Sequence, residues 1–376
     1  MEKTTVILPT FNRSSYLIET LDSLFAQTLQ PDEIIVADDG STDDTPQVMA
    51  RLEGRVRYIR KANSGKADTL NQIIPTVQNP LIWIMDDDDL AMPNALADMS
   101  GLLNGRPEIG FSYGRYERFR VDPQTGEKII WDCGYWREAD RDGFALANLE
   151  DFFVHHPGLL VRRTSYETVG PFELRYGRTE DYEMMIRLAR RFTPLKTDNV
   201  VFLQRQHDGE RHGGLAADQR TTRWMKEEAG IFETARGMLD LPEYLSAADR
   251  ARPLTPVLRR RALINRSVVM ARHRLWSHAL EDLAAACALV GNEPLEPQER
   301  NAVRRALFSK YGCREVLTDR EIKQGLRELA RQGPLGRDIT RTFAGSLAFF
   351  IRTRVQSGRV SEATRYAMLA VSLLAA

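Results

Sequence analysis

The chain has 376 residues, 43% of them hydrophobic, which is enough for a proper core in one large or two ordinary domains. Lysine plus arginine and aspartate plus glutamate number 52 each, and this neutral balance excludes a general electrostatic attraction to nucleic acid or to an anionic bilayer. Three scattered cysteines, Cys133, Cys287 and Cys313, form neither a disulfide framework nor a zinc pattern, so a reducing compartment fits best.

The two ends of the sequence show no pattern typical of secretion or of a membrane span. The N-terminal sequence MEKTTVILPTFNR leads directly into a strand and lacks the apolar region of a signal peptide. The longest apolar run near the C-terminus, within Phe343 to Ile351, is too short to cross a bilayer. We therefore expect a cytoplasmic protein, and peripheral contact with a membrane stays compatible with the sequence.

The first part of the chain alternates short apolar runs with helical patterns, which predicts a succession of strands and helices. The expected strands are Thr5–Leu8, Glu33–Ala37, Val56–Arg60 and Leu81–Met85, and the expected helices between them are Ser14–Gln27, Pro46–Arg51 and Lys66–Ile74. Such a βαβαβαβ order implies a parallel sheet with helices on both faces.

Four consecutive aspartates, Asp86 to Asp89, follow the last of these strands directly. Carboxylates held this close repel one another unless a cation or solvent compensates. A hard divalent cation, Mg²⁺ or Mn²⁺, prefers such oxygen ligands, and open α/β sheets bind ligands outside the carboxyl ends of their strands. An isolated run of this kind is more often a solvated acidic turn that caps the next helix, so its neighbours in the sequence decide between the two interpretations.

From about Gly110 the pattern changes to longer strands. Strands are expected at Phe111–Val121, at the end of the stretch His155–Arg163 and at Val200–Gln204, with a hairpin turn at Asp122–Gly126. Thr179–Arg191 predicts an amphipathic helix with acidic residues in its first turn. For the histidine pair His155 and His156 we expect a structural role rather than contact with a substrate.

After about Arg220 the sequence shows helical spacing to its end. The stretches HALEDLAAACALVG and GRVSEATRYAMLAVSLLAA are loosely alike, which hints at stacked helical hairpins. We expect an α/β catalytic domain over residues 1–220 and an all-α domain over residues 221–376, with the boundary between Arg220 and Pro253.

Seven pieces of the sequence, in this order, resemble the inverting, GT-A-fold glycosyltransferases of family 2. They cover roughly residues 4 to 210 and read VILPTFNRSSYLIETLDSLFAQT, EIIVADDGSTDDT, NSGKADTLN, WIMDDDDLAMPNAL, RRTSYETVGPFE, TEDYEMMIRL and RQH. The resemblance implies the GT-A fold of nucleotide-diphospho-sugar transferases, a Rossmann-like mixed sheet. The all-α C-terminal region has no counterpart in the family's catalytic core.

The resemblance assigns recognition of the nucleotide to the ends of the first two strands. Phe11 can lie on the flat face of a base, and Asp39 can accept the imide N–H of uracil. Positive charge near the diphosphate can come from Arg13 and Lys66, although both are equally well read as ordinary solvated cations. The nucleotide-binding residues are thus expected to be Pro9, Thr10, Phe11, Arg13, Asp39, Lys66, Asp86 and Asp87.

In the family, an Asp-x-Asp element supplies carboxylate ligands to a divalent cation on the diphosphate. Counting back from Pro93, the resemblance places this element at Asp86 and Asp88, with Asp88 as the direct ligand. Asp87 and Asp89 are then expected to face ribose or solvent. His207, in RQH, matches a position where many relatives present a histidine to the metal. The implied cofactor is Mn²⁺ or Mg²⁺.

An inverting transfer needs a base that takes the proton of the acceptor hydroxyl as its oxygen attacks C1 of the sugar. The family places this base in a Glu-Asp pair at the start of a helix, and the pair resembles Glu180 and Asp181, with Asp181 as the base. The simpler interpretation is that both carboxylates only complement the helix dipole.

The resemblance thus implies an enzyme that moves one sugar from a nucleotide-sugar donor, expected to be UDP-linked, to a hydroxyl of a saccharide, lipid-linked or protein acceptor. Surface polysaccharide or glycoconjugate biosynthesis is the implied setting. Processive polymerising relatives carry a Gln-x-x-Arg-Trp element, whereas the nearest string here, Gln219 to Trp224, has one residue too many. This departure favours addition of a single sugar.

Two alternatives remain open at this stage. A sugar-nucleotide pyrophosphorylase would need a glycine-rich phosphate loop near the first strand, and PTFNRSS contains no glycine. A non-catalytic nucleotide-sugar-binding relative would act through its helical C-terminal module, which could bind a partner, an acceptor or a second copy of the chain. The intact carboxylates Asp86, Asp88 and Asp181 argue against this second alternative.

Overall fold

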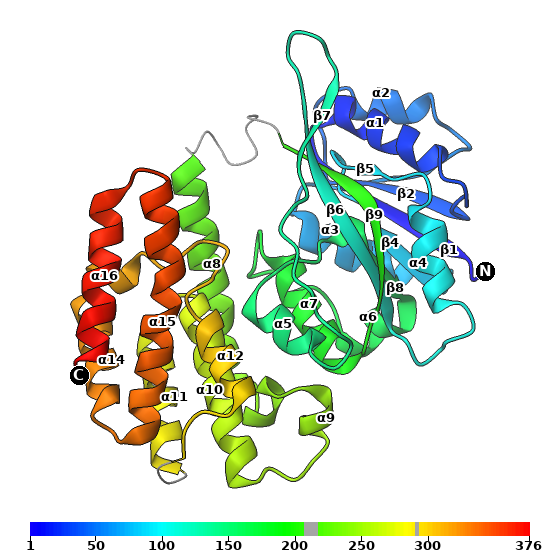
Figure 1. Cartoon of the computed structure of the whole chain (residues 1–376). Helices are drawn as coiled ribbons and strands as arrows, with labels where there is room; N and C mark the ends of the chain where they lie inside the picture. The colour runs from blue at the N-terminus through cyan, green and yellow to red at the C-terminus, as the bar shows by residue number, and fades with distance from the viewer. Residues whose placement is uncertain (207–216, 290–292) are drawn as a thin grey trace. The chain divides into compact units, whose positions relative to one another are not determined.

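The structure, a computed structural model, describes residues 1–206, 217–289 and 293–376 (Figure 1). The chain divides into two compact units. The first unit runs over Met1–Phe144 and resumes at Phe152, and the second unit takes the short segment Ala145–Asp151 and the helical C-terminal part.

A mixed sheet forms the centre of the first unit, as predicted for the GT-A fold. Among the described residues the sheet has nine strands in the order β3-β2-β1-β4-β8-β6-β9-β5, with β7 paired to β6. The strands are β1 (Thr4–Thr10), β2 (Glu33–Asp38), β3 (Arg57–Arg60), β4 (Leu81–Ile84), β5 (Leu90–Ala91), β6 (Phe111–Val121), β7 (Lys128–Asp132), β8 (Leu159–Arg162) and β9 (Leu195–Arg205).

The first four strands confirm the predicted parallel succession. Strand β1 pairs in parallel with β2 and β4, and β2 pairs in parallel with β3. Strand β8 runs antiparallel to β4, so the sheet becomes mixed on that side of β4. Beyond β8, strands β6 and β9 pair in parallel, and β6 with β7 forms the predicted hairpin. The carboxyl ends of β1, β2 and β4 therefore lie together at one edge.

Helices cover both faces of this sheet, because the buried strands alternate apolar side chains toward each face. Val6, Leu8 and Trp83 belong to one apolar cluster with residues of α1 and α4, while α3 contacts β1. The helical elements are α1 (Ser14–Phe25), α2 (Thr45–Ala50), α3 (Lys66–Ile73), η1 (Ile74–Thr76), α4 (Ala95–Leu103), η2 (His156–Gly158), α6 (Arg163–Val169) and α7 (Glu180–Arg191).

The second unit consists of helices, as predicted for the C-terminal part. Its helical elements are α8 (Ala217–Met238), η3 (Leu241–Tyr244), α9 (Ala247–Arg250), α10 (Pro256–Arg272), α11 (Trp276–Leu289), α12 (Pro297–Arg305), α13 (Glu315–Thr318), α14 (Arg320–Ala330), α15 (Pro334–Gln356) and α16 (Val360–Leu374). Helices α10 and α11 pack against each other, and so do α15 and α16 (Figure 1).

Helix α5 (Phe144–Glu150) places a short stretch of the earlier chain in this helical unit. Glu150, which is fully buried, accepts a hydrogen bond from Arg305 at 2.8 Å, and Asp151 forms a buried ion pair with Arg272. The ring of His273 lies 3.0 Å from the carbonyl oxygen of Leu149. These contacts attach residues 145–151 to helices far away in the sequence.

Across the described ranges, no helix combines the length and the apolar character that crossing a membrane requires.

Candidate active site

Polar side chains gather where the parallel strands β1, β2 and β4 end. Thr10 and Asp38, the last residues of β1 and β2, are partners in the strand register. The backbone N–H of Asp39 donates to the carbonyl of Thr10 at 2.9 Å, so the two chains stay joined one residue further. The run Asp86–Asp89 follows β4, which is the other neighbour of β1. Ligands of α/β sheets bind at an edge of this kind.

Asp87 and Asp88 are held by Thr10 at the end of β1 and by Arg13 just beyond it. The hydroxyl of Thr10 donates to Oδ2 of Asp87 at 2.7 Å. The guanidinium of Arg13 forms an ion pair with Asp88 and lies 3.3 Å from Oδ1 of Asp87. Asp88 is 1% exposed, so Arg13 compensates a carboxylate that is almost fully removed from water.

Asp86 pairs with Lys66, the first residue of α3, whose Nζ lies 2.5 Å from Oδ1 of Asp86. Burial works against the positive charge of Lys66, but the carboxylates of Asp86, Glu180 and Asp181 outweigh it and raise the pKa of Lys66. Charges from the end of β4 and from the start of α7 thus both act on this ammonium group of α3. The structure therefore brings together four of the residues that the sequence singled out.

Asp181 lies in the first turn of α7 beside Glu180, which is 5% exposed. Burial, and then the charge of Glu180, raise the pKa of Asp181 to about 7. The charge of Asp86 acts in the same direction, whereas Lys66 opposes the increase. A carboxylate whose pKa lies near 7 takes up a proton more readily than an ordinary aspartate, as a general base requires.

Our expectation that Asp87 and Asp89 face ribose or solvent is not met for solvent, because these residues are only 7% and 1% exposed. Oδ1 of Asp89 accepts the backbone N–H of Arg205 at 2.9 Å. The carbonyl oxygen of Asp89 accepts from the hydroxyl of Thr20 at 2.8 Å. Burial, followed by the charge of Asp86, raises the pKa of Asp89 well above its ordinary value. Asp89 thus anchors the acidic run to β9.

Asp39 lies at the end of β2 and is 5% exposed. Its carboxylate accepts the backbone N–H groups of Ser64 at 2.9 Å and Gly65 at 2.7 Å, and it forms an ion pair with Lys61. The carboxylate therefore organises the loop that precedes α3 and Lys66. A carboxylate has about four acceptor positions, so these contacts are compatible with one more donor such as an imide N–H.

The two apolar residues predicted to lie against the nucleotide differ in exposure. Pro9 is buried within β1. Phe11, just beyond the strand, has 44% of its surface exposed. An exposed aromatic ring at the carboxyl edge of a sheet is placed to stack on a flat partner.

The predicted metal ligands fall partly within the described residues. His207 lies outside them, so its predicted role is not described by the structure. In the ranges with described side chains, no group of three or more histidine, cysteine or acidic residues is arranged to hold a metal ion. Asp86 and Asp88 nevertheless fit a divalent cation, because Mg²⁺ and similar ions bind through one or two carboxylates together with substrate phosphates and water.

Three residues near this edge were not predicted as parts of the site. Lys61 pairs with Asp39, and Arg205 donates from Nε to the carbonyl of Asp88 at 2.9 Å. His156, in η2, is 3% exposed and is affected electrostatically by Lys66 and Asp86. The sequence signal for His156 is its place in HHPG, directly before β8, and neither Lys61 nor Arg205 has a comparable signal.

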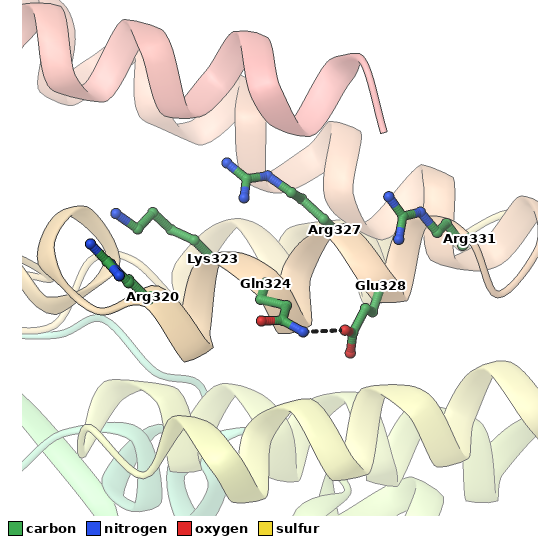
Figure 2. Close-up of a pocket in the computed structure, with 6 residues that line it drawn as sticks. All are labelled: Arg320, Lys323, Gln324, Arg327, Glu328 and Arg331. Atoms are coloured by element: carbon green, nitrogen blue, oxygen red, sulfur yellow. Dashed lines mark hydrogen bonds between the residues drawn. The ribbon is translucent and has the colours of Figure 1, made fainter.

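A separate groove lies on α14 in the second unit (Figure 2). Its volume is about 540 Å³, and its lining residues are Arg320, Lys323, Gln324, Arg327, Glu328 and Arg331. The amide of Gln324 donates to Glu328 at 2.7 Å, while four lining side chains are cationic. None of the residues of the sequence motifs lies there, so the groove is not the candidate active site.

Comparisons with known proteins show similarity to glycosyltransferases. Residues 5–170 match the family model described as glycosyl transferase family 2. An uncharacterized glycosyltransferase of Rickettsia typhi is 26% identical over 206 residues, which are 54% of this chain and 64% of that protein. The chondroitin synthase of Pasteurella multocida is 33% identical over 189 residues, which are 49% of this chain and 18% of the synthase. The chain thus spans less than two thirds of the length of these curated relatives.

Among solved structures, a mannosyltransferase from Pyrobaculum calidifontis, in complex with GDP-Man and Mn²⁺, has a similar fold. The TM-score is 0.50 at 19% sequence identity, and the match covers 77% of this chain and 76% of the mannosyltransferase. This likeness supports the GT-A architecture that the strand order indicates.

Proposed function

We propose that this chain, whose residues 5–170 match glycosyl transferase family 2 and whose fold is similar to that of a mannosyltransferase, transfers a single sugar from a UDP-sugar to an acceptor hydroxyl, with inversion at C1. One observation carries this proposal: Lys66 Nζ lies 2.5 Å from Asp86 of the acidic run, and the charges of Glu180 and Asp181 also raise the pKa of Lys66. The ammonium group of Lys66, which suits a diphosphate, is therefore influenced by the carboxylate of Asp181, which suits an acceptor proton.

The donor nucleotide would bind at the ends of β1 and β2. Phe11 would stack on the base, and Asp39 would accept the imide N–H of uracil while it keeps the loop before Lys66 in place. Arg13 and Lys66, which pair with the acidic run, would supply positive charge to the diphosphate.

Asp181 would act as the general base. Its carboxylate, ionised above a pKa of about 7, takes the proton of the acceptor hydroxyl as the oxygen forms its bond to C1 of the sugar. The C1–oxygen bond to the diphosphate breaks on the opposite face, and the diphosphate leaves with the electron pair. Glu180 would keep the pKa of Asp181 high.

Asp88 and Asp86 would hold the divalent cation. When bound, Mn²⁺ or Mg²⁺ stabilises the negative charge that develops on the diphosphate leaving group. Two carboxylate ligands suit a cation that completes its shell with phosphate oxygens and water.

The relatives support a polysaccharide or glycoconjugate acceptor. The similar proteins of Pasteurella multocida are named chondroitin synthase and hyaluronan synthase, and the similar solved structure contains GDP-Man and Mn²⁺. We therefore keep GDP-linked donors in the experimental panel beside UDP-sugars.

A donor panel tests the proposal. The full chain is incubated with UDP-glucose, UDP-galactose, UDP-N-acetylglucosamine or GDP-mannose, with and without Mn²⁺, and mass spectrometry detects the released nucleoside diphosphate. We expect metal-dependent release from at least one donor. Release from none of them would favour a non-catalytic binding protein that acts through its helical unit.

A further inference from the structure

His156 is a buried polar side chain whose hydrogen-bonding groups are unused within the described structure. It is 3% exposed, and neither Nδ1 nor Nε2 has a hydrogen-bond partner among the described residues. Buried polar groups are nearly always hydrogen-bonded, and each exception calls for an explanation. One such explanation is that the side chain forms its hydrogen bonds with a bound ligand.

Ring and hydrogen-bond contacts hold the segment of the imidazole in place. The indole Nε1 of Trp83 donates to the carbonyl of Pro157 at 2.8 Å, which attaches η2 to β4. The ring of Phe172 meets the imidazole edge to face, with centroids 5.5 Å apart and planes at 79°. Asn71 on α3 fixes the backbone of Phe172 by two hydrogen bonds, of 2.7 and 2.8 Å. The imidazole is therefore positioned from both β4 and α3.

These same two elements carry the proposed diphosphate-binding groups. Lys66 begins α3 and Asp86 follows β4, and both affect the imidazole electrostatically. Burial, followed by the charge of Lys66, lowers the pKa of His156 to about 3, so the ring is neutral at physiological pH. A neutral imidazole offers one N–H donor and one acceptor nitrogen.

We propose that His156 forms a subsite that recognises a hydroxyl group of the donor sugar. This inference rests on the proposed function. A sugar hydroxyl both donates and accepts, which matches a neutral imidazole, whereas a phosphate would call for a cation. Within the described residues, His156 does not join Asp86 in a metal-binding group. The subsite places a sugar-specific contact within the electrostatic influence of Lys66, which is predicted to bind the diphosphate.

Three variants of the full chain test the subsite. His156→Phe keeps the ring contact with Phe172 and removes both nitrogens, and His156→Gln keeps a donor and an acceptor. His155→Phe is the matched control, because His155 packs its ring against Tyr116 and Phe152, with centroids 5.0 and 4.7 Å away.

Isothermal titration calorimetry with Mn²⁺ compares the Kd of each sugar nucleotide of the donor panel with that of UDP or GDP alone. His156→Phe should raise the ratio of the Kd of the preferred sugar nucleotide to the Kd of the bare nucleotide about tenfold. His156→Gln should reverse part of this increase, and His155→Phe should leave the Kd ratio unchanged. His156→Phe should also keep or raise the Tm, because it removes two buried polar atoms that have no partner.

An unchanged Kd ratio in a folded His156→Phe protein would overturn the proposed subsite, while the proposed function would stand. An equal loss for UDP and for the sugar nucleotide would also overturn it, because the contact would then lie on the nucleotide. Absence of binding of every sugar nucleotide to the wild-type chain would refute the proposed function and the subsite with it.

Discussion

Asp181 owes its raised pKa first to burial and then to the charge of Glu180. An ordinary aspartate, with a pKa near 4, would be a weak base toward a hydroxyl group. The start of α7 changes this, because it places two carboxylates side by side in a partly buried position that Lys66 only partly neutralises. At the scale of single residues, burial and neighbouring charge thus set the pKa of Asp181 in the range that suits a general base.

We expect Asp181→Asn to reduce transfer by a factor of about 10² to 10⁴ while UDP binding is retained. Because the folded-state pKa of Asp181 is raised, its ionised form lowers stability as the pH rises from about 4 to 7. The variant should therefore keep or increase the Tm at pH 8, and a loss of activity would not reflect unfolding. Glu183→Gln, in the same turn, is the control. Sugar transfer by the Asp181→Asn variant at the wild-type rate would exclude Asp181 as the base.

The pH dependence gives an independent check on Asp181. A base must be deprotonated to act, so kcat/KM should fall as the pH decreases through about 7 and reach a plateau above it. Glu180→Gln removes the charge that raises this pKa and should move the acidic limb to lower pH. A plateau that extends unchanged to pH 5 in the wild-type protein would contradict the assignment.

Asp88→Asn should reduce the Mn²⁺-dependent increase in UDP affinity at least about tenfold, because the variant loses the proposed direct ligand of the cation. Titration calorimetry with and without Mn²⁺ measures this difference. Asp98→Asn is the control, since Asp98 lies on α4 and accepts from Asn199 at 2.8 Å. Equal metal dependence in Asp88→Asn and wild type would show that the cation binds elsewhere.

At the scale of elements, the loops at the sheet edge support one another by close contact. Gly40, after Asp39, has φ +83, and a Cβ atom there would lie 2.9 Å from the backbone nitrogen of Asn63. Only glycine combines this left-handed conformation with such a close approach. The loop of Asp39 therefore packs directly on the loop that leads to Lys66.

A pair of substitutions separates the cost of the left-handed backbone conformation from the cost of steric overlap. Gly54 has φ +82, but a Cβ atom added there would meet no other atom within 4 Å, so Gly54→Ala tests the conformational cost alone. We expect Gly40→Ala to be less stable than Gly54→Ala by about 1–3 kcal/mol, because the overlap adds to the backbone strain. Denaturant unfolding measures the difference, and equal stabilities would show that the two loops are not packed as described.

Sequence patterns predicted the elements well and their long-range contacts poorly. The apolar runs of β1, β2 and β4 and the acidic tip after β4 were recognisable because they are local patterns. The family resemblance singled out Lys66 and Asp181, but no pattern indicates that both act on one charge cluster. For His156 the sequence favours a structural role, because a sequence does not show whether a buried nitrogen has a hydrogen-bond partner.

At the scale of the whole molecule, residues 145–151 belong to the helical unit through contacts that no local pattern predicts. Asp151 and Arg272 are 121 residues apart in the sequence, and Glu150 and Arg305 are 155 apart. A division of the chain at about residue 220 would therefore separate buried charges from their partners. The helical unit is structurally linked to the chain segment that immediately precedes Phe152 and the HHPG motif.

Removing one partner of a buried ion pair leaves a charge without compensation. We therefore expect Arg272→Met, which removes the ion pair with Asp151, to destabilise the protein by about 3–5 kcal/mol. Arg252→Met is the control, because Arg252 is 66% exposed and its pair with Asp249 should contribute less than about 1 kcal/mol. Thermal unfolding of both variants gives the comparison, and similar Tm values would contradict the attachment of residues 145–151.

The most direct test of the central claim is the time course of nucleoside diphosphate release from the preferred donor in the presence of acceptor and Mn²⁺, for wild type and Asp181→Asn side by side. We predict rapid release by the wild-type protein, and release slowed at least about 10²-fold by a variant that still binds UDP. Release at the wild-type rate by Asp181→Asn would contradict a reaction driven by a carboxylate at the start of α7.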